Sequence, residues 1–281
     1  MRVVLDKDID PSRAFIYVHV PKCGGTYTKS LIDTYLSGQE NFYTPDTDMH
    51  QSLDSIVGYR TRDSLLFEGV KTTGSVGRIE LNFTSFVLCS LRDPFSWYDS
   101  YYYFKQTYEE RSNEIRRQPL VPLSSERQGD YKQALTNCMN KSYIEKCSAT
   151  VLQGGFCPSV WMKELDIGFY TAWFLYSLGD HKAIFDNLKN LKGNDLINNA
   201  ELIRKDLLKF SFFDISQIDE NIESALSSFA QSEVSLPRQE VLRKTNYSKG
   251  YTKSSDILNS DPYLLERFLW KERLMFKLFY I

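Results

Sequence analysis

No stretch of this 281-residue sequence is apolar over the ~18 residues that a membrane-spanning helix requires. The start at Met1 also lacks a long apolar leader, which predicts a cytoplasmic protein, although a chain trimmed of a membrane anchor would show the same pattern. No segment rich in proline, glycine or serine divides the chain, and we find neither an internal repeat nor a low-complexity segment. With 42% hydrophobic residues the chain can bury a large core. We therefore expect a single domain over residues 1–281 and no membrane partner.

The sequence is also poor in net positive charge and in metal-ligand patterns. Its formal net charge is -2, so no overall basic field attracts nucleic acid, and a heavily sulfated glycan is disfavoured as a substrate. The five cysteines form an odd count without metal-type spacing, which favours reduced thiols. No paired-carboxylate motif demands magnesium. We expect no metal and no nucleic-acid partner, and nothing in the sequence defines an oligomeric state.

A glycine-rich turn follows the first apolar run, in residues 15–26 (FIYVHVPKCGGT). Backbone N–H groups at Gly24 and Gly25 can point at phosphate oxygens, the helix predicted over the next dozen residues adds its positive end, and Lys22 supplies a mobile charge. The standard ATP-binding loop carries its lysine after the last glycine, whereas Lys22 precedes both glycines, so this is not a standard ATP loop. The alternative is an ordinary strand-turn-helix connection with a solvated lysine.

A second short apolar run, Phe86–Leu91, has the pattern of a strand buried on both faces of a parallel sheet. It ends at Arg92, after which Asp93 can cap a helix that starts at Pro94. Ser100 then lies about two turns into this helix. The planar guanidinium of Arg92 can bind two phosphate oxygens at once and Ser100 adds a neutral donor, while the alternative for Arg92 is a structural salt bridge.

Together the two segments resemble those of sulfotransferases that use 3′-phosphoadenosine 5′-phosphosulfate (PAPS), including small bacterial members. That family holds the 5′-phosphosulfate in a Pro-Lys-Thr-Gly-Gly-Thr loop and binds the 3′-phosphate with an arginine at a strand end and a serine eight residues later. The resemblance implies an α/β sulfotransferase fold, with a P-loop-like parallel sheet flanked by helices. It implies that PAPS, and the product 3′-phosphoadenosine 5′-phosphate (PAP), contact Lys22, Cys23, Gly24, Gly25, Thr26, Tyr27, Arg92 and Ser100.

Two positions depart from the family pattern. Cys23 stands where the family most often has threonine, a change that backbone contacts tolerate. Trp97 stands where many relatives carry arginine or lysine, so nucleotide affinity should fall or the charge should come from another loop. The family often closes over the adenosine and the 3′-phosphate with a basic segment, and residues 243–250 are such a segment, with Arg243 and Lys244 as the expected contacts. A solvated linker is the alternative for this short basic run.

The reaction requires a base for the acceptor proton and a cation for the leaving nucleotide. Lys22 is placed for the second task. Of the three histidines, His50 is our candidate base, because it follows the first helix in a His-x-Ser motif that recurs in similar bacterial sulfotransferases. His19 we interpret as structural and directed away from the cofactor, and His181 is remote from every motif. Glu68, or an acceptor that needs little base assistance, is the alternative to His50.

A more distant resemblance is to Golgi glycan 2-O-sulfotransferases. It rests on three features. The cysteines Cys138, Cys147 and Cys157 are closely spaced, residues 101–104 form an aromatic run, and glycosylation sequons occur at Asn82, Asn140 and Asn246. Those enzymes carry their base in a Gly-His segment before the arginine-bearing strand, and here residues 71–77 contain no histidine.

We therefore predict sulfuryl transfer from PAPS to a hydroxyl, or to an amide or carbamate nitrogen, of a small-molecule acceptor such as a natural product. Three alternatives stay open: a glycan O-sulfotransferase domain of the secretory pathway, an ATP-using P-loop kinase, and a catalytically silent nucleotide binder. For the fold we expect alternating strands and helices over residues 14–108, mostly helix over 130–230, and a last helix from Asp261–Pro262 with an apolar core stripe.

Overall fold

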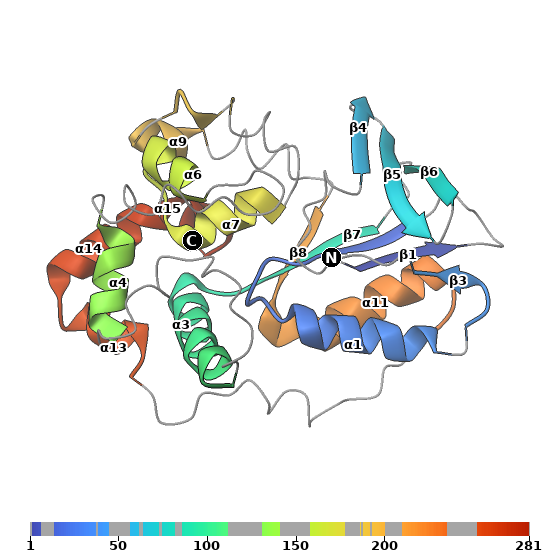
Figure 1. The fold of residues 1–281 in the computed structure, drawn as a ribbon, viewed down its shortest axis with the longest axis horizontal. Coiled ribbons are helices and arrows are strands. Elements are labelled where there is room, and N and C mark those ends of the chain that lie inside the picture. Colours follow the sequence, from blue (N-terminus) through green and yellow to red (C-terminus); the bar gives the residue numbers. More distant parts are fainter. Residues whose placement is uncertain are drawn as a thin grey trace. The chain divides into compact units, whose positions relative to one another are not determined.

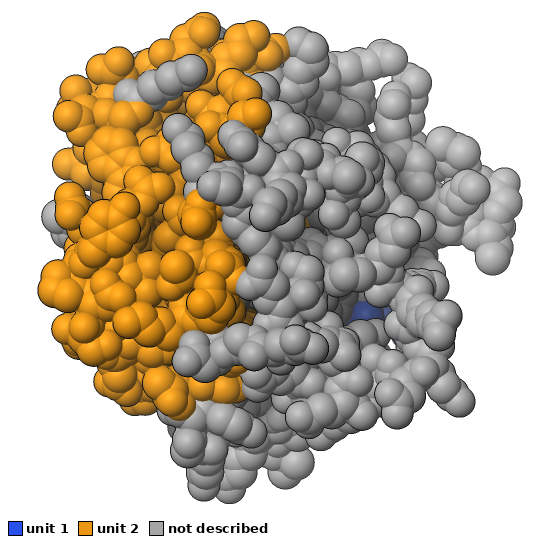
Figure 2. Space-filling view, turned by 60° about the vertical axis from the view of Figure 1, so that its left-hand side comes forward, with its two compact units in different colours: residues 1–92, 175–181, 206–245 blue, residues 93–174, 182–205, 246–281 orange. Residues whose placement is uncertain are grey.

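The computed structural model describes the larger part of the chain, in the ranges 2–6, 14–37, 39–44, 57–61, 64–72, 75–81, 86–111, 131–140, 158–177, 186, 188–191, 193–199, 210–234 and 252–280. Contacts group the chain into two compact units, which Figure 2 colours separately: residues 1–92, 175–181 and 206–245 form unit 1, and residues 93–174, 182–205 and 246–281 form unit 2. The single domain expected from the sequence stays a prediction.

Unit 1 contains a five-stranded sheet in the order β3-β1-β2-β7-β8. Its strands are β1 (Arg2–Asp6), β2 (Ala14–Val18), β3 (Phe42–Tyr43), β7 (Phe86–Leu91) and β8 (Phe210–Asp214). Strands β2, β7 and β8 are parallel, and β1 is antiparallel to both β2 and β3. All residues of β2 are buried, as are those of β7 after Phe86, which confirms the prediction of a parallel strand covered on both faces.

Two helices of unit 1, α1 (Gly25–Leu36) and α11 (Ile218–Ala230), lie side by side against the sheet (Figure 1). The 3-10 turn η3 (Ile215–Gln217) leads from β8 into α11. The apolar faces of α1 and α11 pack against the same side of the sheet and form one core cluster with it. This cluster contains Val4, Phe15, Tyr17, Leu31, Ile32, Leu88, Phe213, Ile218, Ile222, Leu226, Phe229 and Val234. The helix predicted after the glycine turn is confirmed as α1, and its buried apolar stripe determines which of its faces packs against the sheet.

A second sheet of unit 1 was not predicted. It consists of β4 (Val57–Thr61), β5 (Ser64–Thr72) and β6 (Ser75–Leu81), paired antiparallel in chain order. The chain therefore does not run directly from α1 into the next parallel strand, β7.

Unit 2 is helical in its described residues. Its elements are α3 (Pro94–Arg111), α4 (Tyr131–Met139), α6 (Pro158–Leu165), α7 (Phe169–Ser177, whose last three residues group with unit 1), α9 (Asn194–Asn198), α13 (Ser254–Asn259), α14 (Pro262–Lys271), α15 (Arg273–Met275) and the π-helical turn η4 (Phe276–Tyr280). None of the helices in the described ranges has both the length and the apolar content to cross a membrane.

Two expectations about helical segments need correction. Phe213 lies within residues 130–230, which we expected to be mostly helical, but it belongs to strand β8 beside β7. The predicted helix from Pro262 is present, with Asp261 capping the N–H of Leu264 at 3.1 Å, but Leu269, which a helical period places on its apolar stripe, is 42% exposed. A helical period alone did not distinguish this position from the buried Phe268.

Candidate functional site: a glycine loop at the sheet edge

The glycine loop connects the carboxyl end of β2 to the first turn of α1. Two of its residues have left-handed backbones, Lys22 with φ of 67° and Gly24 with φ of 82°. Glycine adopts this region freely, whereas for lysine it costs about 1 kcal/mol. Strained non-glycine residues of this kind concentrate at functional sites, so the conformation of Lys22 supports a role for this turn.

The start of α1 leaves backbone donors open. Its N-cap residue is Gly24, which provides no side-chain cap, and the first turn contains no acidic residue. In the described part of the chain, the N–H groups of Gly24, Gly25 and Thr26 donate to no protein acceptor. Unpaired first-turn donors and the positive end of the helix dipole together favour a bound anion.

A buried network lies under the loop. The Ser90 hydroxyl at the end of β7 donates to the carbonyl oxygen of Cys23 and is also hydrogen-bonded to the Tyr17 hydroxyl of β2. The Tyr17 oxygen itself lies 3.3 Å from the Cys23 carbonyl oxygen. Burial raises the pKa of Tyr17, so its hydroxyl stays protonated and remains a donor. Sequence reasoning did not identify either hydroxyl, because neither belongs to a loop motif.

Both glycines of the loop are required by packing against protein atoms. A Cβ on Gly24 would lie 2.5 Å from Cδ1 of Ile218, at the start of α11. A Cβ on Gly25 would lie 1.9 Å from Cδ2 of His19, whose ring is buried and stacked on Tyr17. His19 therefore supports the loop, in agreement with the structural role expected for it.

We predict that Gly25→Ala destabilises the protein by about 1–3 kcal/mol, since the buried His19 ring cannot withdraw from the new methyl group. Denaturant unfolding measures the effect, and a double-mutant cycle with His19→Ala tests its cause. The cost of Gly25→Ala should shrink in the His19→Ala background, and an undiminished cost would contradict the clash.

The other side chains of the loop differ in their surroundings. Cys23 is fully buried and forms no disulfide, so its side chain cannot reach a ligand in solvent. Thr26 is exposed, whereas the Tyr27 hydroxyl donates to Oδ1 of Asp219 in α11 at 2.7 Å. The loop can therefore offer backbone N–H groups, the Thr26 hydroxyl and Lys22 to a ligand.

Arg92 lies at the same edge of the sheet as the glycine loop. Strands β2 and β7 are parallel neighbours with Val18 opposite Cys89, so the residues that follow each strand emerge together. Arg92 is half-buried and comes directly after β7. Helix α3 begins two residues later at Pro94, with the N–H of Ser96 bonded to Asp93 Oδ1 at 3.0 Å, which confirms the predicted cap.

Ser100 lies in α3, within unit 2, and is half-buried. Asp99 beside it accepts hydrogen bonds on Oδ1 from the Tyr131 hydroxyl and from the N–H of Ser254, both at 2.7 Å. Asp99 thus links the start of α13 and the start of α4 to helix α3. Among the described residues the Ser100 hydroxyl has no hydrogen-bond partner.

Trp97 is a core residue of unit 2. It is fully buried and stacks on Tyr101 and Tyr170, with ring centroids 5.1 and 4.7 Å apart. This packing gives Trp97 a structural role in the core of unit 2.

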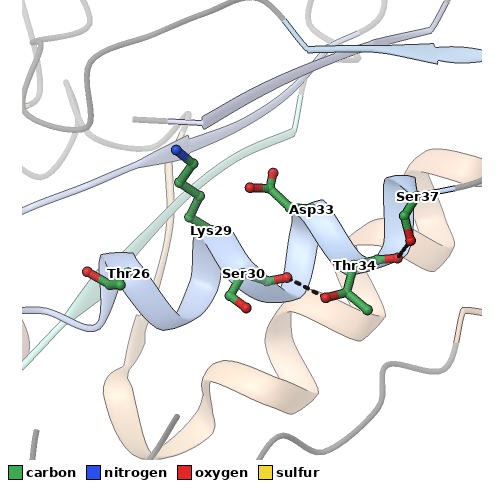
Figure 3. A pocket seen from close by; sticks show the side chains of 6 residues that line it. All are labelled: Thr26, Lys29, Ser30, Asp33, Thr34 and Ser37. Atoms are coloured by element: carbon green, nitrogen blue, oxygen red, sulfur yellow. Dashed lines mark hydrogen bonds between the residues drawn. The ribbon is translucent and has the colours of Figure 1, made fainter. Parts of the chain in front are cut away.

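A hollow of about 440 Å³ runs along the outward face of α1 (Figure 3). Its six lining residues are four with hydroxyl groups and two of opposite charge, namely Thr26, Lys29, Ser30, Asp33, Thr34 and Ser37. The hydroxyls of Thr34 and Ser37 donate to carbonyl oxygens of the helix itself, at 2.8 and 2.7 Å. Lys29 and Thr26 are thus the lining side chains nearest the loop that can meet a ligand.

Three predicted site residues, His50, Arg243 and Lys244, lie outside the described residues, as does His181. Their roles stay predictions. Among the cysteines, Cys23, Cys89 and Cys138 are buried and form no disulfide, and the other two lie outside the described ranges.

The family comparison agrees with this geometry. The sequence model of the sulfotransferase family matches residues 6–262. The matched residues include the glycine loop, the parallel strands β2 and β7, and Arg92. Comparison with curated proteins and with solved structures gave no significant match.

Proposed function

Because the chain belongs to the sulfotransferase family, we propose that it transfers the sulfuryl group of PAPS to a hydroxyl, or to an amide or carbamate nitrogen, of a small acceptor such as a natural product. Family membership supports a transferase that moves sulfuryl groups, and the mixed fold with its three parallel strands is consistent with it. The identity of the donor and the class of acceptor are the parts proposed here.

The observation that carries the proposal is the pairing of an open glycine loop with Arg92 at one sheet edge. The unpaired N–H groups of Gly24, Gly25 and Thr26 suit the 5′-phosphosulfate end, as the backbone of a P-loop suits a phosphate. Arg92 suits a second phosphate group, with Ser100, Arg243 and Lys244 as further proposed contacts. Two anionic groups on one nucleotide match PAPS better than ATP, whose standard loop places its lysine elsewhere.

Bound PAPS would supply the sulfuryl group. As the acceptor oxygen forms its bond to sulfur, the bond from sulfur to the bridging 5′-phosphate oxygen breaks and PAP leaves. Lys22 stabilises the negative charge that builds on that bridging oxygen, and His50 takes the proton lost by the acceptor. Positioning and electrostatics therefore provide most of the catalysis, as in phosphoryl transfer.

The small acceptor is proposed from charge and from the hollow on α1. A net charge of -2 gives no general attraction for a polyanionic glycan. The hollow begins at Thr26 in the loop, and the Thr26 hydroxyl and the Lys29 ammonium group in its lining support a small polar acceptor.

The test is thermal stabilisation of the purified protein by PAP, compared with ADP, AMP and ATP, without added metal. A nucleotide well above its dissociation constant raises the unfolding temperature. We expect a clear shift with PAP and little with the nucleotides that lack a 3′-phosphate. A preference for ATP, or no shift at saturating PAP, would overturn the assignment. Binding of PAP without turnover on a broad acceptor panel would indicate a silent nucleotide binder.

For His50→Ala we expect turnover to fall by about 10²-fold with the affinity for PAP nearly intact, because a general base acts on the acceptor proton and not on the nucleotide. The measurement is release of PAP from PAPS with the acceptor that the panel identifies. His181→Ala, a histidine remote from the motifs, serves as the control. Unchanged turnover in His50→Ala would eliminate His50 as the base.

A further inference from the structure

The carbonyl group of Cys23 is held beneath the glycine loop by two buried hydroxyl groups. Ser90 Oγ donates to this carbonyl oxygen, and the Tyr17 hydroxyl is hydrogen-bonded to Ser90. Ser90 and Tyr17 come from the neighbouring parallel strands β7 and β2, and both are buried to within 1% of full burial. If Tyr17 donates to Ser90 and Ser90 to Cys23, each hydroxyl proton is used once.

The direction of this carbonyl fixes the direction of the next N–H group. The peptide bond between Cys23 and Gly24 is trans, since the described residues contain no cis peptide bonds, so its N–H points opposite to its C=O. With the carbonyl oxygen directed into the buried network, the Gly24 N–H is directed outward. The left-handed backbone of Gly24, with φ of 82°, then leads into the first turn of α1, whose N–H groups are also open.

We propose that Ser90 and Tyr17 are positioning residues, which hold the Cys23–Gly24 peptide so that its N–H binds the 5′-phosphate group of the nucleotide. The inference rests on the proposed function, because it takes the nucleotide as the anion. Ser90 acts directly on the carbonyl, whereas Tyr17 acts mainly through Ser90. Loss of the Ser90 hydroxyl should therefore weaken 5′-phosphate binding more than loss of the Tyr17 hydroxyl.

The experiment compares Ser90→Ala and Tyr17→Phe with the unaltered protein by calorimetric titration of PAP and of adenosine 3′-monophosphate, which lacks the 5′-phosphate. We expect the affinity for PAP to fall about tenfold in Ser90→Ala and about threefold in Tyr17→Phe, the range of one weakened hydrogen bond. The affinity for adenosine 3′-monophosphate should stay unchanged, so the ratio of the two affinities reports on the loop alone.

Tyr98→Phe is the matched control, because Tyr98 is an equally buried tyrosine of unit 2 whose hydroxyl bonds to Glu272 at 2.6 Å. It should lower the unfolding temperature without changing the ratio. If the ratio of the affinities for PAP and adenosine 3′-monophosphate is unchanged in Ser90→Ala, whether neither affinity falls or both fall equally, the inference is overturned while the proposed function stands. Failure of the unaltered protein to bind PAP would overturn both, and so separates the two cases.

Discussion

Lys22→Ala is expected to lower turnover by about 10²- to 10³-fold at saturating PAPS, the loss seen when one group that stabilises developing negative charge is removed. Lys22 sits in the turn before α1, in a left-handed conformation that fixes where its side chain starts. In the proposed reaction its full charge matters most when the bridging oxygen of the leaving nucleotide becomes negative, so the effect should fall on turnover more than on affinity. The measurement is single-turnover release of PAP from PAPS.

Two further variants make this result specific. Lys163→Ala removes an exposed lysine of α6, outside the proposed site, and should leave turnover within a few-fold of the unaltered protein. Arg92→Ala should show the opposite division, with the affinity for PAP falling about 10- to 100-fold and turnover at saturating PAPS largely kept, because the proposed charge-assisted bond to the 3′-phosphate would exist before and during reaction. Equal losses in Lys22→Ala and Lys163→Ala would contradict the proposed role of Lys22.

The glycine loop and the turn at Arg92 could be predicted because their signals are local. An apolar run, two glycines and a helical stripe lie within about two dozen consecutive residues, and β2 and α1 follow that pattern. At the second turn, Asp93 and Pro94 mark the start of α3 to the residue. Both junctions could therefore be assigned before any pairing of strands was known.

The elements that were missed depend on distant partners. β8 is only five residues long and becomes a strand by pairing with β7, Ser90 opposite Phe213, across a long separation in sequence. Ser90 likewise gains its proposed role through the carbonyl of Cys23 and the hydroxyl of Tyr17, which lie 67 and 73 residues away in the sequence. Neither the strand nor the hydroxyl network has a signature in consecutive residues, so the sequence alone predicted the loop but not its support.

A buried carboxylate organises unit 2 in a way that the sequence did not indicate. Glu272 is fully buried and follows α14, and it accepts four hydrogen bonds, three from the start of α7 and one from α3. The donors are the Tyr98 hydroxyl at 2.6 Å, the N–H of Tyr170 at 3.2 Å, and both the N–H and the hydroxyl of Thr171 at 3.1 and 2.6 Å. Glu272 thus caps α7 from a separate helix, and a Cβ on Gly168 would lie 1.8 Å from its Oε1.

Removing this carboxylate should strongly destabilise the folded protein. Glu272→Ala would leave four buried donors without their acceptor, at a cost of about 3–5 kcal/mol in the free energy of unfolding. Denaturant unfolding measures it, with the exposed Glu266→Ala of α14 as the matched control. A loss no larger than that of the control would show that water or a rearranged chain satisfies these donors.

The same carboxylate predicts a pH dependence with a definite sign. Burial is the main cause that raises the pKa of Glu272 above its ordinary value of 4.5, against the opposing hydrogen bonds from Thr171 and Tyr98. The folded protein therefore keeps this proton to higher pH than the unfolded chain. The resulting stabilisation is complete below pH 4.5 and is lost as the pH rises through the folded pKa.

Glu272→Gln does not titrate, so the stability of the unaltered protein relative to Glu272→Gln should decline as the pH is raised from 4.5. A relative stability that instead rises with pH would mean that the four donors favour the ionised carboxylate by more than burial opposes it.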